Sequence, residues 1–133
     1  MAEATIEIAR RDWHRVLDEF NAIHEGWLVT VDVLSAAFGA QTEIANLPLV
    51  GIMVEGHRPD SLAVAAGFHD DHIVHRIESP RRLWIARLDE RVDAAVEIES
   101  ADGTKTIVRF KSPMLPETVD GASRRSTTGG ATR

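Results

Sequence analysis

The chain has 133 residues and no cysteine, and its 15 basic and 21 acidic residues give a net charge of −6. The lack of cysteine excludes disulfides, thiol nucleophiles and thiolate metal sites. The acidic balance disfavours nucleic acid and anionic lipid as partners. No apolar run reaches the roughly 18 residues that a membrane helix needs. We therefore expect a soluble, cytoplasmic protein with no nucleic-acid or membrane partner.

The clearest helical pattern covers residues 12–23. Asp12 is placed to cap its start, and Gly26 to turn the chain out of the helix in the left-handed conformation. Five large apolar residues recur at spacings of three and four and so form one stripe: Trp13, Val16, Leu17, Phe20 and Ile23.

Segments typical of strands follow, with turn residues between them. We expect strands over residues 27–34, 40–47, 50–55, 61–66, 73–77 and 82–88, then a hairpin over 94–110. Pro48 should end the second strand or mark a bulge. With only one helix available as a crossover, the strands should be antiparallel. The expected fold is α+β, with one N-terminal amphipathic helix packed on a curved, barrel-like meander of seven or eight strands.

The hairpin has a definite predicted register. Residues 99–104 fit a type I turn closed by a glycine bulge at Gly103. If Ser100 pairs with Thr104, then Ile98 faces Thr106 on the same side as the other apolar residues of the hairpin.

We assign residues 1–121, which include this hairpin, to a single α+β domain. Residues 122–133, rich in Ser, Thr, Gly and Arg, are expected to form a disordered tail.

One stretch, residues 69–75, has the donor types of a metal site. Its candidate ligands are Asp70, Asp71 and His72, with His75 nearby. Strand geometry argues against the site, because His72 and His75 would point to opposite faces. Trp27, Trp84 and His75 are candidate ligand-binding residues, although large aromatics at core spacing more often belong to the core. No Gly-x-Ser-x-Gly elbow or phosphate-binding glycine loop is present, so catalytic residues remain unassigned.

Several segments are distinctive as sequence: Trp13, residues 26–30, 47–49 and 51–52, residues 71–72 with His75, residues 97–103, and residues 109–110 through 112–113 to 115–121. In these segments the chain resembles a family of small bacterial proteins catalogued only as a domain of unknown function. The resemblance brings no known activity or cofactor, and it implies that residues 115–121 belong to the folded unit.

The function that these observations favour is a non-catalytic module that binds a partner protein or a small ligand, without a cofactor. Such a module could form a homodimer through an exposed edge strand. The alternative is a metal-binding protein or hydrolase that uses Asp71, His72 and His75. A third hypothesis is a ligand-holding barrel lined by Trp27 and Trp84.

Overall fold

The computed structural model describes residues 4–56, 58, 60–68, 70–89 and 92–111. The expected domain boundary at residue 121, residues 115–121 and the expected tail over 122–133 lie outside them. The described elements, in chain order, are β1 (Ala4–Ile8), the 3₁₀ helix η1 (Arg10–Asp12), α1 (Trp13–His24), β2 (Leu28–Ser35), β3 (Gly39–Glu55), β4 (Ser61–Phe68), β5 (Asp71–Glu78), β6 (Pro80–Asp89), β7 (Val92–Ser100) and β8 (Lys105–Phe110). No described helix is both long enough and apolar enough to cross a membrane.

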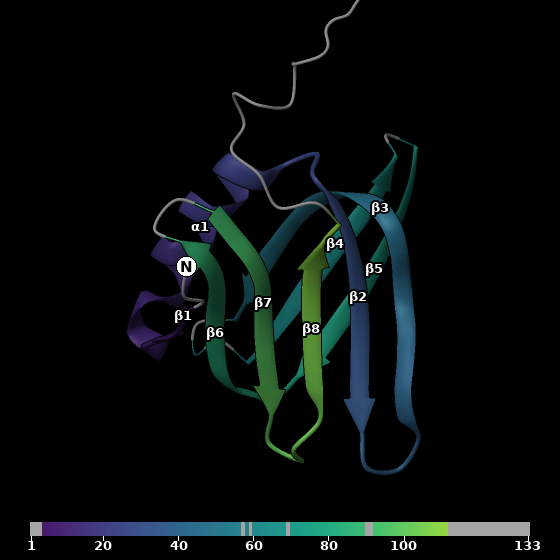
Figure 1. Ribbon diagram of the computed structural model, residues 1–133. Helices are drawn as coiled ribbons and strands as arrows, with labels where there is room; N and C mark the ends of the chain where they lie inside the picture. The colour runs from purple at the N-terminus through teal and green to yellow at the C-terminus, as the bar shows by residue number, and fades with distance from the viewer. Residues whose placement is uncertain (1–3, 57, 59, 69, 90–91, 112–133) are drawn as a thin grey trace, which may run out of the picture.

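The eight strands form one antiparallel sheet in the order β1-β6-β7-β8-β2-β3-β4-β5. The prediction of one helix on an antiparallel sheet is confirmed, but the barrel-like closure and the simple meander are wrong. β1 returns to pair with β6, and β8 pairs with β2. The sheet therefore stays open, with β1 and β5 at its edges, and folds over so that β4 and β5 cross behind the other strands (Figure 1).

β3 joins the two layers, because its first half pairs with β2 and its second half with β4. We expected Pro48 to end a strand or to mark a bulge, and the structure has a single strand of 17 residues with register shifts on both sides of Pro48. The N–H of Leu49 donates to the carbonyl of Trp27 at 2.8 Å. Pro48 therefore lies opposite Leu28 in a non-hydrogen-bonded pair, where the N–H that proline lacks is not required. Asn46, at φ 53°, and nearby register shifts accommodate the bend.

The amphipathic helix is confirmed, but its buried stripe is narrower than predicted. Trp13, Leu17 and Phe20 are buried, and His24 rather than Ile23 completes the row. At about 100° per residue, positions 13, 17, 20 and 24 fall within one narrow arc, whereas position 23 falls outside it. Ile23 is consequently 57% exposed.

Neither end of the helix depends on a side-chain cap. Asp12 makes no capping bond, because it ends η1 in a helical conformation and a cap requires an extended one. It lies 3.4 Å from Arg15 instead. At the other end Gly26 has φ 89°, as predicted for a residue that leaves a helix in the left-handed conformation.

The helix is fastened to β3 by one amide side chain. The Nδ2 group of Asn21 donates to the carbonyl of Ile52, and its Oδ1 accepts from the N–H of Ile52, both at 2.9 Å. The Asn21 side chain thus makes the two backbone hydrogen bonds to Ile52 that a neighbouring strand would otherwise make. Gly51 permits the approach, because a Cβ atom there would lie 3.4 Å from the Asn21 amide carbon and 3.1 Å from the Met53 sulfur.

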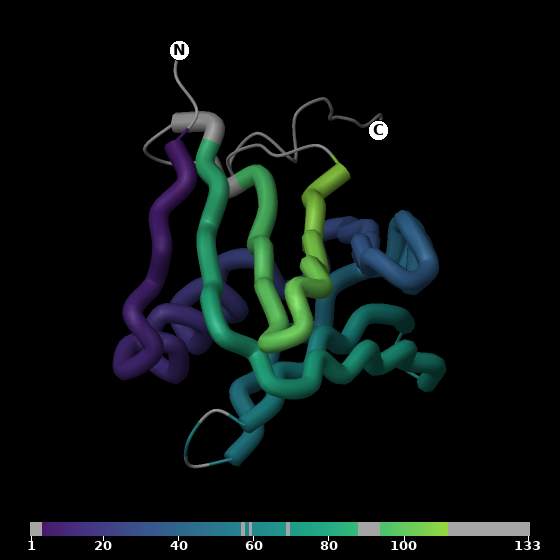
Figure 2. Tube along the Cα trace, turned by 90° about the horizontal axis from the view of Figure 1, so that it is seen from below, coloured from purple at the N-terminus to yellow at the C-terminus, as the bar shows by residue number. Residues whose placement is uncertain are grey.

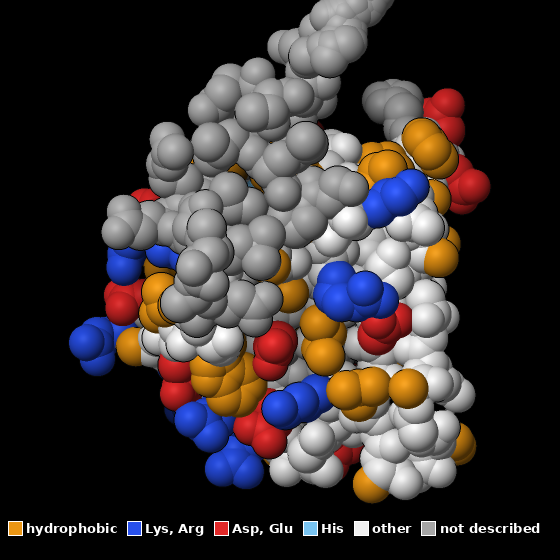
Figure 3. Space-filling model, viewed as in Figure 1, with side chains coloured by type: hydrophobic (Ala, Val, Ile, Leu, Met, Phe, Trp, Pro, Cys, Tyr) orange, Lys and Arg blue, Asp and Glu red, His pale blue; other side chains and the backbone are white. Residues whose placement is uncertain are grey.

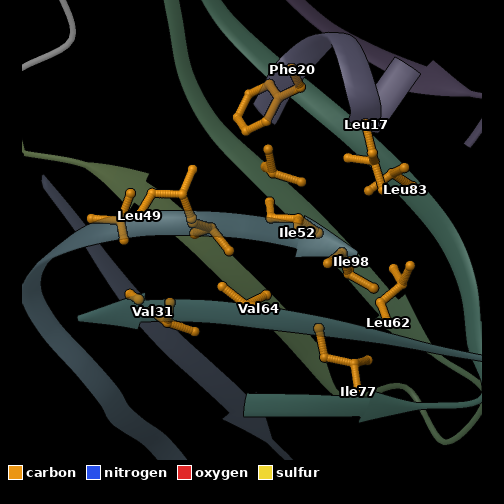
Figure 4. Close-up of a cluster of buried hydrophobic side chains, with 14 of the residues drawn as sticks. Leu17, Phe20, Val31, Leu49, Ile52, Leu62, Val64, Ile77, Leu83 and Ile98 are labelled. Carbon is orange, nitrogen blue, oxygen red and sulfur yellow. The ribbon is translucent and has the colours of Figure 1, made fainter. Parts of the chain in front are cut away.

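The core lies between the helix and the two layers. Leu17 and Phe20 point from α1 toward Ile52 and Leu83, and below them Leu62, Val64 and Ile98 fill the space between the layers (Figure 4). The final hairpin has the predicted register, with Ile98 opposite Thr106 and Val96 opposite Val108. Its turn is closed by the N–H of Ser100, which donates to the carbonyl of Thr104 at 2.9 Å.

The helix stripe supplies a first prediction. Leu17→Ala should lower the free energy of unfolding by about 2–5 kcal/mol, since Leu17 is 1% exposed and its loss leaves a cavity. Ile23→Ala removes a comparable side chain from the exposed side of the same helix, and it should cost under about 1 kcal/mol. Urea denaturation of both variants measures the difference. Equal losses would contradict the placement of the stripe.

Candidate functional site

A small cleft opens between the two layers, beside the free edge of β5. Its volume is about 200 Å³. The turn between β7 and β8 lies beside the link from β5 to β6 (Figure 2), and the N–H of Ala101 in this turn donates to the carbonyl of Ser79 in that link. The cleft is lined by Val33, His75, Arg76, Ile77, Glu78, Ser100, Asp102, Thr104 and Thr106.

The inner wall of the cleft carries polar side chains with open hydrogen-bonding capacity. Thr106 is 2% exposed and Ser100 is 9% exposed. Neither hydroxyl, nor the half-buried His75 ring, hydrogen-bonds to any residue of the described chain. Buried polar groups of native proteins are nearly always paired with protein or water. Val33 and Ile77 supply the apolar part of the same wall.

Charged residues surround this wall. Arg76 donates through Nε and Nη2 to the two carboxylate oxygens of Glu55, at 2.9 and 3.0 Å. These bonds, together with one from the Ser61 hydroxyl, lower the pKa of Glu55 from 4.5 to about 2. Hydrogen bonding to Glu55 and the charge of Glu78 raise the pKa of Arg76. Arg76 therefore stays charged, and its charge is matched by these carboxylates.

Asp102 stands on the turn between β7 and β8. Its Oδ1 accepts from the N–H of Thr104 at 2.9 Å, and this bond lowers the pKa of the Asp102 carboxyl. The remaining lone pairs of an ionised carboxylate can accept further hydrogen bonds. Asp102 and Glu78 are thus two acidic residues among those that line the cleft, and the guanidinium of Arg76, which also lines it, is held by Glu55.

The structure does not bring the sequence-predicted ligand residues together. His75 lines the cleft, and Trp27 and Trp84 are not among its lining residues. The Trp27 ring packs edge-on against the rings of the buried His24 and of Phe110, with distances between ring centroids of 4.7 Å and 5.2 Å. The His24 Nδ1 lies 2.8 Å from the carbonyl oxygen of Phe20.

Trp84 lies on the outer side of the front layer, away from Leu83 and Ile85. The guanidinium of Arg82 is 4.9 Å from its ring centroid, and the Lys105 ammonium is 5.7 Å away. Figure 3 shows this outer surface, where hydrophobic and charged side chains of both signs are interspersed. Since the sheet is open and its interior is filled by side chains, the hypothesis of a ligand-holding barrel has no support.

The predicted metal ligands lie along β5 and the turn before it. Asp71 and His75 share one face but are four residues apart, or about 13 Å along a strand. His72 points to the opposite face from both. Across the described ranges, which omit His69, no three acidic or histidine side chains come close enough to hold a metal ion. Asp70 has an interaction of its own within the protein.

Most of the cleft was missed by sequence reasoning. Arg76, Glu78, Asp102 and Ser100 looked like ordinary surface and turn residues. Thr106 gave the one usable signal, because the predicted hairpin register already placed its hydroxyl on the apolar face opposite Ile98.

The fold and the cleft define an open β-sheet domain with one N-terminal helix and a small polar site at its edge. The chain matches the model of a family of unknown function, DUF5335, over residues 4–119. It therefore belongs to this family, as the resemblance in its sequence indicated. No curated protein and no solved structure matches it significantly.

The ion pair beside the cleft gives a prediction about pH. The folded-state pKa of Glu55 lies below its ordinary value, so the stabilisation is complete above about pH 4.5 and is lost as pH falls toward about 2. Glu55→Gln should therefore be less stable than the parent at pH 7. The difference should be small, because the pair is exposed, and should shrink steadily below pH 4.5.

Urea denaturation between pH 3 and 7 measures this effect. Glu43→Gln, on the exposed side of β3, is a control for the change in net charge. A Glu55→Gln difference that stays constant over the whole range would contradict the assignment.

Proposed function

We propose that the protein is a non-catalytic binding module that works by strand addition, in which the free edge of β5 accepts an extended strand from another chain. The observation that carries this proposal is the outer side of the eight-residue strand β5, which pairs with no other strand among the described residues. Strand addition of this kind uses main-chain hydrogen bonds for affinity and adjacent pockets for specificity.

The hydrogen-bond pattern identifies the open groups. The N–H of Ser79 donates to the carbonyl of Asp60, which makes these two a hydrogen-bonded pair. Hydrogen-bonded and non-hydrogen-bonded pairs alternate along antiparallel strands, so Ile73, His75 and Ile77 bond to β4. The residues between them direct their backbone N–H and C=O groups to the free edge: His72, Val74, Arg76 and Glu78.

The exposed side chains of this strand support a protein partner. Val74 is 54% exposed, Ile73 is also exposed, and so is Phe68 at the end of the neighbouring β4. A long edge with apolar side chains invites pairing with another chain. The opposite edge is less open, because β1 has five residues and its Glu7 holds Arg82 of β6 at 2.9 Å.

We take a second copy of this chain as the strand donor. Two β5 strands related by a two-fold axis at Val74 run antiparallel and keep their inward faces on one side. Val74 then pairs with Val74 of the second copy through two backbone hydrogen bonds, and the exposed valines lie side by side. Ile73 comes opposite His75 in the same arrangement.

A non-catalytic role is supported by the surroundings of His75. Within the described residues, its ring hydrogen-bonds to neither a carboxylate nor a hydroxyl. A nucleophile needs a base in reach and a group that orients that base. Asp71, His72 and His75 are also separated along β5. No observation therefore favours the alternative of a metal-binding protein or hydrolase.

Blocking the free edge should disrupt self-association. Val74→Pro removes the N–H that points away from β4, a position where an edge strand tolerates proline. The symmetric pair then loses both bonds, and self-association should weaken by about tenfold or more. Val74→Thr keeps the N–H and should associate like the parent.

Size-exclusion chromatography with light scattering over a wide concentration range measures this, with circular dichroism to check the fold. A parent chain that stays monomeric at every concentration would overturn the proposal. So would a dimer that Val74→Pro leaves intact.

A further inference from the structure

We propose that the cleft beside β5 binds the primary ammonium group of a small molecule. This inference goes beyond strand addition, since it concerns a different ligand and different side chains. It combines three observations that point to one chemistry: buried hydroxyls that hydrogen-bond to no described residue, two acidic residues that line the same cleft, and a volume too small for a large ligand.

The hydroxyls provide the first part of the argument. Thr106 is 2% exposed and lines the cleft, and its hydroxyl makes no hydrogen bond to another described residue. Ser100 adds a second hydroxyl in the same state. Leaving a buried polar group unpaired costs about as much as a lost hydrogen bond, so a bound partner is favoured at these positions. A hydroxyl oxygen can accept, and an ammonium group has three donors and no acceptor.

The charges select a cation over an anion. Glu78 and Asp102 line the cleft, whereas the one guanidinium among the lining residues is engaged by both carboxylate oxygens of Glu55. An incoming anion would meet two acidic residues, and the one guanidinium among the described lining residues is already paired. An ammonium group would gain charge-assisted hydrogen bonds, which are shorter and stronger than neutral ones.

The dimensions limit the rest of the ligand. A volume of about 200 Å³ is below the roughly 300–1,000 Å³ of pockets for drug-sized ligands. Val33 and Ile77 form an apolar strip on the wall, which suits a short alkyl chain. The ligand class is therefore a small alkylamine in its protonated form.

The test uses three probes with the full chain, followed by nuclear magnetic resonance of the backbone amides and the His75 ring. Ethylammonium carries both the charge and the N–H donors. Tetramethylammonium carries the charge without donors, and acetate carries the opposite charge. We expect saturable shifts confined to the cleft residues with ethylammonium, and weaker or no saturable shifts with the other two. Absence of saturation with ethylammonium, or an equal response to tetramethylammonium, would overturn the inference.

Two variants locate the site. Thr106→Val keeps the shape of the side chain and removes only the hydroxyl, so the fold should be as stable as the parent or more so. Its affinity for ethylammonium should fall about tenfold, a loss of about 1.4 kcal/mol. The double variant Glu78→Gln with Asp102→Asn keeps an acceptor for the Thr104 N–H and should also weaken binding. Unchanged affinity in both variants would overturn the inference.

Glu43→Gln controls for net charge and should leave the affinity unchanged. Repeating the titration on Val74→Pro separates this site from strand addition. Ethylammonium binding that persists in that variant supports the cleft site whatever the oligomeric state. Self-association without ethylammonium binding would overturn the cleft site and leave strand addition standing.

Discussion

The docking of α1 on the second half of β3 is the interaction on which the rest of the structure depends. β3 leaves β2 beyond Pro48 and would otherwise present an open edge to the core. The Asn21 amide satisfies both backbone groups of Ile52 at that edge. Burial of Trp13, Leu17 and Phe20 beside it contributes about 1.5–3 kcal/mol for each side chain. One helix therefore closes an edge and fills the core at once.

The bend of β3 also decides where the open edge lies. Because the second half of β3 turns behind the first layer, β4 and β5 follow it there, and β5 is the last of the described strands on that side of the sheet (Figure 1). The link through Ser79, at φ 51°, returns the chain to the front layer as β6. β5 consequently stands opposite the ends of β2 and β8, with the cleft between. The free edge and the cleft have the same topological origin.

Electrostatics give this region its chemical character. The Arg76 guanidinium donates hydrogen bonds to Glu55, and the charge of Glu78 also raises the pKa of Arg76. Arg76 is thus part of a network with more negative than positive charge. The acidic bias agrees with the net charge of −6 for the chain. In this setting the hydroxyls of Thr106 and Ser100, which hydrogen-bond to no described residue, suit a ligand that donates hydrogen bonds.

The sequence by itself determined the features that depend on spacing over a few residues. These are the helix and three buried members of its stripe, the left-handed Gly26, and the register that sets Ile98 against Thr106. Only the tertiary structure decided which strands pair over long distances, that β3 continues through Pro48, and that His24 is buried instead of Ile23. It also decided that residues from β2, β5, β7 and β8 meet in one cleft. The physical reason is that local patterns fix which side of an element is apolar, whereas pairing and bending follow from how those sides pack together.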